Sequence, residues 1–82
     1  MAIKKYRGES MESYLYTVAE VSEILKINKN AVYELINHGL LQGLKLGAMK
    51  ITKLEVVRFL DTYNGKNLDD LDNVKDLMVV AN

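Results

Sequence analysis

The chain has 82 residues, of which 49% are hydrophobic and 27% are charged, so it has room for one globular domain with one modest core. Its apolar runs are too short to span a bilayer, which takes roughly 18 residues, and without cysteine it forms neither disulfides nor a thiolate metal site. Eleven basic residues balance eleven acidic ones, which argues against strong binding of nucleic acid through many phosphate contacts.

Residues 1–13 form a basic N-terminal arm. The arm holds three basic residues against two acidic ones, namely Lys4, Lys5 and Arg7 against Glu9 and Glu12. No hydrophobic segment follows these charges, so we expect no secretory signal and predict a cytoplasmic location. The arm is expected to be flexible. Met11 is an alternative natural start, and the chain would then carry eight basic and ten acidic residues.

Two short helices are predicted next, over about residues 18–26 and 29–38. Thr17 and Glu20 have the spacing of a capping box, in which each side chain accepts a hydrogen bond from the other residue's backbone N–H. Asn28 is a favourable N-cap for the second helix, and a glycine ends it because glycine adopts the left-handed conformation without steric cost. The predicted inward positions are Val18, Val21, Ile24 and Leu25 in the first helix and Val32, Leu35 and Ile36 in the second.

A β-hairpin and a third helix are predicted after this glycine. Leucines alternate with Lys45 before a Gly-Ala pair, and apolar residues alternate with Lys50 after it, which is typical of two short strands around a tight turn. Thr52 and Glu55 form a second capping box and open a helix over about residues 53–63. The candidate core positions of this helix are Leu54, Val57, Phe59 and Leu60.

Residues 64–82 form an acidic C-terminal segment. Asn67 is placed to cap a weaker helix over about residues 68–79, whose acidic residues lie near its N-terminus, where the helix dipole favours them. Its apolar residues at helical spacing are Leu68, Leu71, Val74 and Met78. The sequence thus predicts an additional C-terminal helix or an acidic tail, which packs on its own domain, forms a dimer interface or docks on a partner.

The predicted elements of residues 14–63 follow the order of a winged helix-turn-helix, a mainly α fold with three helices and a small two-stranded β-hairpin. In this fold the first helix braces the second, and the N-terminal residues of the second helix enter the DNA major groove. The hairpin is the wing, which reaches the neighbouring backbone or minor groove. The fold class therefore predicts double-stranded DNA as the partner.

The residues themselves resemble the excisionase-like, MerR-related helix-turn-helix family over about residues 14–61. The resemblance implies a DNA-binding regulator or a recombination directionality factor of a mobile element. A MerR-type effector sensor is not expected, because the long coiled coil and effector region of such proteins do not follow. The matching segments are Tyr14-Leu-Tyr-Thr-Val-Ala-Glu-Val-Ser-Glu-Ile-Leu-Lys-Ile-Asn-Lys-Asn-Ala-Val-Tyr-Glu-Leu-Ile-Asn-His-Gly-Leu-Leu41, Lys45-Leu-Gly47 and Ile51-Thr-Lys-Leu-Glu55, continuing to Phe59-Leu60.

The resemblance places the DNA-contacting residues on the second helix and the wing. Asn30 would pair with adenine through both its amide oxygen and its amide nitrogen, and Lys29 would meet a guanine or a phosphate. Asn28 stands where the family usually has serine, so a cap and a phosphate contact are both open. Instead of contacting DNA, the Tyr33 ring could pack against the first helix, and the wing lysines could simply be solvated. The N-terminal arm is either flexible or bound in the DNA minor groove. The full predicted set is Asn28, Lys29, Asn30, Tyr33, Asn37, Lys45 and Lys50.

Two features depart from the family pattern. The wing is nearly uncharged, and Glu34, at a position often basic in relatives, would repel phosphate. We therefore expect weak binding by one copy, strengthened by self-association or by an integrase or recombinase partner. Two functions stay open, namely sequence-specific DNA binding as an excisionase-type factor or small transcriptional regulator, and a protein-interaction adaptor with the winged fold. The sequence predicts no catalytic constellation, cofactor, metal, small-molecule substrate or membrane association.

Overall fold

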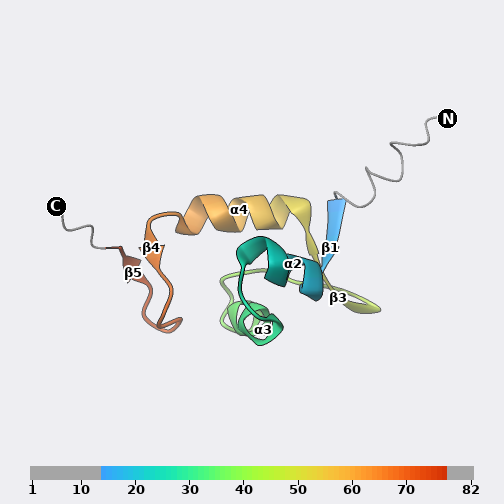
Figure 1. Cartoon of the computed structure of the whole chain (residues 1–82), viewed down its shortest axis with the longest axis horizontal. Coiled ribbons are helices and arrows are strands. Elements are labelled where there is room, and N and C mark those ends of the chain that lie inside the picture. Colours follow the sequence, from blue (N-terminus) through green and yellow to red (C-terminus); the bar gives the residue numbers. More distant parts are fainter. Residues whose placement is uncertain (1–13, 78–82) are drawn as a thin grey trace.

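The computed structural model describes residues 14–77, so the predicted N-terminal arm and the end of the predicted C-terminal helix lie outside the described residues. The elements are β1 (Leu15–Thr17), α2 (Val18–Leu25), α3 (Lys29–Asn37), β2 (Leu44–Leu46), β3 (Ala48–Thr52), α4 (Lys53–Tyr63), β4 (Lys66–Asn67) and β5 (Lys75–Asp76). α4 runs along one side of the molecule, with α2 and α3 packed together beneath it (Figure 1). The β2–β3 hairpin and the β4–β5 pair lie at opposite ends (Figure 1). None of the described helices has the length and apolar character that a membrane crossing requires.

The starts of α2 and α3 follow from their capping residues. The Thr17 hydroxyl accepts the Glu20 N–H at 3.1 Å, and the Glu20 carboxylate accepts the Thr17 N–H at 2.8 Å, which confirms the capping box. Asn28 Oδ1 accepts the Ala31 N–H at 2.7 Å, which confirms the predicted N-cap of α3. Both helices therefore begin where polar side chains satisfy backbone donors that the helix itself leaves unpaired.

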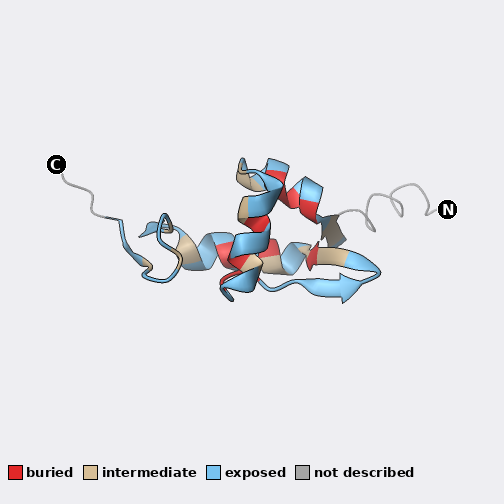
Figure 2. Cartoon of the chain, turned by 90° about the horizontal axis from the view of Figure 1, so that it is seen from below, coloured by how far each residue is buried: buried red, intermediate tan, exposed pale blue. Residues whose placement is uncertain are grey.

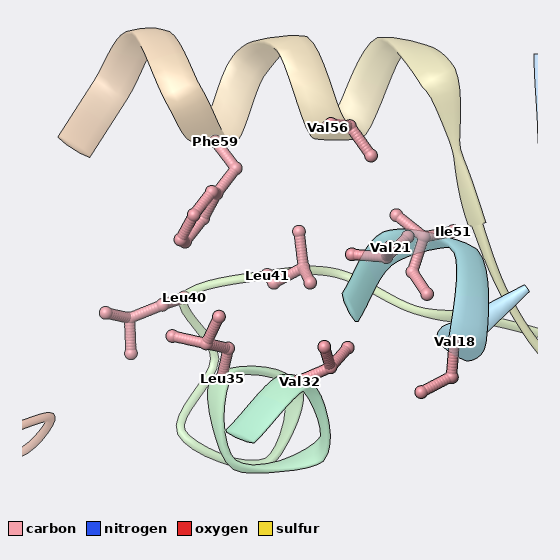
Figure 3. Close-up of a cluster of buried hydrophobic side chains, with 9 residues drawn as sticks. All are labelled: Val18, Val21, Val32, Leu35, Leu40, Leu41, Ile51, Val56 and Phe59. Carbon is pink, nitrogen blue, oxygen red and sulfur yellow. The ribbon is translucent and has the colours of Figure 1, made fainter. Parts of the chain in front are cut away.

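α3 ends in a chain reversal that depends on glycine. Gly39 has a φ of +80°, a conformation that other residues rarely adopt. The backbone N–H groups of Leu40 and Leu41 then both donate to the Leu35 carbonyl, at 3.0 and 3.2 Å. The reversal turns both leucine side chains into the core, as Figure 3 shows. The predicted glycine stop is confirmed.

The wing hairpin belongs to a three-stranded antiparallel sheet with the strand order β1-β3-β2. Gly47, with a φ of +74°, forms the predicted turn between β2 and β3. The sequence pattern does not predict β1, because its three residues run straight into the capping box of α2. β1 pairs with β3 so that Tyr16 lies opposite Ile51. The sheet therefore anchors the base of the wing to the start of the helix-turn-helix.

The hydrophobic core lies where α2, α3 and α4 face one another. The buried residues of these helices lie on the faces turned toward the centre (Figure 2). Phe59 and Val56 of α4 point toward Leu41 and toward the side chains of α2 and α3 (Figure 3). Ile24, which the pattern predicts to be inward, is instead 41% exposed. The core residues are Val18, Val21, Val32, Leu35, Leu40, Leu41, Ile51, Val56 and Phe59.

α4 buries a different face from the predicted one. Phe59 is buried as predicted, but the other buried position is Val56, and Tyr63 packs with its ring centroid 5.1 Å from that of Phe59. Both faces carry apolar residues at helical spacing, so periodicity does not fix the rotation of the helix. The rotation is set by β3, which holds the buried Ile51 and runs into α4 without a loop. The wrongly predicted core residues are Leu54 (80% exposed), Val57 (53%) and Leu60 (48%).

The predicted helix over residues 68–79 is wrong within the described residues. The segment after α4 contains no helix up to residue 77, and β4 and β5 form a short antiparallel pair instead. The side chains of Asn67 and Asp70 accept the N–H groups of Asp69 and Asp72, each two residues further on. Such local bonds compete with helix formation. The apolar residues that pack partly against the core are Leu68, Leu71 and Val74.

Candidate nucleic-acid interface

α3 presents a polar surface away from the core. Val32 and Leu35 point inward, and successive helix residues are about 100° apart, so Asn30, Tyr33 and Asn37 lie on the opposite side. Asn30 and Asn37 are exposed, and Tyr33 is 43% exposed. The structure therefore brings three of the predicted contact residues together on one face of one helix.

The N-terminal end of α3 is open to solvent. Lys29 and Asn30, in its first turn, are both exposed, and this turn contains no acidic residue. Asn28 uses its side-chain oxygen for the cap on Ala31, so the cap interpretation is confirmed, while its amide nitrogen remains a donor. The unpaired N–H groups and the dipole of a helix make its N-terminus favourable for an anion. This end of α3 is thus suited to a phosphate or to the acceptor groups of a base.

The wing presents its two lysines differently. Lys45 of β2 is exposed, whereas Lys50 of β3 is half-buried and donates from Nζ to the Leu46 carbonyl at 3.4 Å. Lys45 lies opposite Met49, and neighbouring residues of a strand point to opposite faces, so the two lysines lie on opposite faces of the hairpin. The hairpin tip and α3 lie on the same side of α4 (Figure 1). Lys45 is therefore the freer of the two predicted wing residues.

A charged pair on α4 fixes the segment between α3 and the wing. Glu55 accepts the backbone N–H of Gln42 at 2.9 Å, and Arg58 donates to the Leu40 carbonyl at 2.9 Å. Arg58 also donates to Glu55 at 2.6 and 2.8 Å, and these hydrogen bonds hold the pKa of the Glu55 carboxyl below its usual value. The second capping box is accordingly only half formed, because the Thr52 hydroxyl accepts the Glu55 N–H but the carboxylate binds elsewhere. Sequence reasoning missed this network, whose loop partners lie 13 and 18 residues away.

In contrast to the N-terminal end of α3, its C-terminal end lies beside acidic side chains. His38 Nε2 lies 3.2 Å from a carboxylate oxygen of Asp72, which brings the acidic C-terminal segment against this end of the helix. His38 Nδ1 lies 2.9 Å from the Glu34 carbonyl oxygen and 3.7 Å from its carboxylate. Negative charge thus gathers beside the last turn of α3, away from Lys29.

An apolar groove separates this end of α3 from the C-terminal segment. The groove has a volume of ≈ 770 Å³, and its lining residues include the acidic Glu34, Asp69 and Asp70. The described residues contain no group of three histidine, aspartate or glutamate side chains that would suit a metal ion. The apolar residues that line the groove include Leu25, Ile27, Leu35, Phe59, Leu60 and Leu68.

The fold and the exposed face of α3 define a winged helix-turn-helix protein, which confirms the predicted fold class: α2 and α3 form the helix-turn-helix and the β2–β3 hairpin forms the wing. A family model described as a helix-turn-helix domain matches residues 15–63. The chain therefore belongs to the helix-turn-helix domain family, a DNA-binding class of domain. Comparison with curated proteins and with solved structures gave no match. The contact of the seven predicted residues with DNA stays a prediction.

Proposed function

We propose that the chain binds double-stranded DNA in a sequence-specific manner, as an excisionase-type factor or a small transcriptional regulator. The observation that carries this proposal is the exposed first turn of α3, where Lys29 and Asn30 stand clear of the core in a helix-turn-helix domain. An α-helix fits the major groove, and the N-terminal residues of the second helix of this motif lie nearest the base edges.

In the proposed complex the residues divide between base edges and phosphates. Asn30 donates to adenine N7 and accepts from adenine N6, while Lys29 donates to a guanine or a phosphate. The free amide nitrogen of Asn28 and the exposed Lys45 donate to backbone phosphates. Lys50 contributes less, because its ammonium group already bonds the Leu46 carbonyl. Tyr33 and Asn37 extend the same face further along the groove.

So few phosphate contacts give one copy only modest affinity. Each neutralised phosphate contributes about −0.9 to the slope of log K against log salt, so we expect a slope of about −2 to −3. A second copy, or an integrase or recombinase on the same DNA, supplies the remaining binding energy. The exposed Leu44 and Leu46 of the wing support such a protein contact, since they are 43% and 60% exposed.

The test is a fluorescence-anisotropy titration of the full chain, at low and moderate salt, on duplexes selected from a randomised pool. The double variant Lys29→Ala/Asn30→Ala is expected to lose at least about tenfold in affinity, since each good base contact is worth about 1–3 kcal/mol. The matched control is Asn73→Ala/Lys75→Ala, which removes the same residue types from exposed positions of the C-terminal segment. Unchanged binding by the first variant, with far-UV circular dichroism like that of the wild type, would refute the proposal.

The apolar groove favours a second candidate function, a protein-interaction adaptor. Its apolar lining and its three carboxylates suit a basic segment of another protein that carries a large apolar side chain. The net charge of zero also lowers affinity for DNA. The same titration separates the two candidates. An adaptor binds no duplex even at low salt, yet forms a stable complex with a protein partner.

A further inference from the structure

Glu34 lies on the very surface that the proposed function assigns to DNA. At about 100° per residue, Asn30, Tyr33, Glu34 and Asn37 fall within an arc of roughly 100° that faces away from the buried residues of α3. The Glu34 side chain is 60% exposed. A helix that inserts this face into the major groove therefore carries the carboxylate in with it.

Among residues 14–77, neither a lysine nor an arginine pairs with the Glu34 carboxylate, and its ion-pair contact is His38 Nδ1 at 3.7 Å. Lys29 lies about 140° away around the helix, at the other edge of the exposed face. Asp69 and Asp70 lie along the same groove as Glu34 and add further negative charge on its side. In the proposed complex, a carboxylate without a lysine or arginine partner among the described residues thus faces the DNA.

A carboxylate in the major groove has one favourable kind of partner. Phosphates repel it, and guanine and thymine present acceptors there. The amino group of adenine lies beside the acceptor N7, which also repels a carboxylate. Cytosine presents the N4 amino donor with no acceptor of its own beside it. Among the four bases, cytosine is therefore the one that a glutamate side chain selects.

Glu34 shares the exposed face of α3 with Asn30, which the proposed function assigns to a base edge. Glu34 follows Asn30 by one turn, about 6 Å along the helix axis. We propose that Glu34 accepts a hydrogen bond from cytosine N4 and thereby determines specificity at one position of the DNA site. This inference rests on the proposed function.

The test is the variant Glu34→Gln. A glutamine side chain offers a donor and an acceptor that match adenine N7 and N6, so the variant should change the preferred base at one position from cytosine to adenine. Wild type and variant are each selected against a randomised duplex pool and then titrated on duplexes that differ in that base pair. We expect the wild type to prefer cytosine by roughly five- to hundredfold, and the variant to prefer adenine. Glu23→Gln, the same charge change at an exposed position of α2, should keep the wild-type preference.

Three other outcomes would contradict this inference. An equal gain in affinity for all duplexes on Glu34→Gln would mean that the carboxylate acts only by repulsion, and the proposal would be wrong. It would also be wrong if both proteins selected the same bases while circular dichroism showed the variant folded. A wild type that binds no duplex in the pool would refute the proposed function itself, and this inference with it.

Discussion

α3 and α4 bury similar apolar faces, but their exposed faces differ in composition. α3 buries Val32 and Leu35, and α4 buries Val56 and Phe59 against the same core. Outward, α3 carries asparagines, a tyrosine and a glutamate, whereas α4 exposes two leucines and a valine among its polar residues. The inward faces make the fold. The outward faces make the difference in function, because the outward face of α3 offers the donors and acceptors that base edges require and exposes no leucine or valine.

The largest expected effect is a loss of stability when the buried face of α4 is changed. Phe59→Ala removes a side chain that is 5% exposed and leaves a cavity between α4 and the other two helices. We expect the free energy of unfolding to fall by about 3–5 kcal/mol, as is usual for a buried phenylalanine. Urea denaturation of the full chain measures this change.

Val57→Ala is the matched control, since Val57 lies on the outward face of the same helix and is 53% exposed. Its cost should stay below about 1 kcal/mol. Similar losses for both variants would contradict the assigned rotation of α4, and with it the contrast between the inward and outward faces.

The part of the fold that the sequence predicts is the part fixed by local chemistry. Polar caps and glycine stops depend on neighbouring residues, so they place the ends of α2, α3 and α4 within one residue. The rotation of α4 is not local, because two apolar stripes compete and β3 decides between them. β1 and the β4–β5 pair escape prediction because their partners lie far along the chain or depend on Asx turns.

The candidate site divides in the same way. The exposed positions of Lys29, Asn30 and Asn37 follow from helical periodicity once Val32 and Leu35 are inward. The bonds from Glu55 and Arg58 to the loop before the wing do not, since an acid and a base three residues apart on a helix resemble an ordinary surface pair. Residue type and spacing thus predict which side chains of α3 face outward. They do not predict how α4 holds the loop between α3 and the wing.

The next largest effect concerns the hydrogen bonds from α4 to the backbone of the loop that follows α3. Glu55→Gln replaces the carboxylate that accepts the Gln42 N–H and the Arg58 guanidinium, so we expect a loss of about 1–2 kcal/mol at pH 7. Arg58 lowers the pKa of Glu55 in the folded state, so this stabilisation is fully present above the ordinary carboxyl pKa of 4.5 and is lost as the pH falls through the lower folded value. The gap between wild type and variant should therefore narrow below pH 4.5.

Urea denaturation at several values between pH 7 and pH 3 measures this narrowing. Asp61→Asn, at an exposed position of the same helix, serves as the control and should unfold like the wild type. A gap of constant size at every pH would mean that Glu55 acts through its shape or its cap and not through its charge.

The smallest expected effect concerns the outward face of α4. Leu54→Gln changes a side chain that is 80% exposed, so the free energy of unfolding should stay within about 0.5 kcal/mol of the wild type, and DNA affinity should not change. Urea denaturation at two protein concentrations and the anisotropy titration measure both quantities. A loss above about 1 kcal/mol that grows with protein concentration would contradict this expectation, because it would mean that a second copy covers Leu54. The contrast between the helices would then become sharper, with α3 facing DNA and α4 facing another copy of the chain.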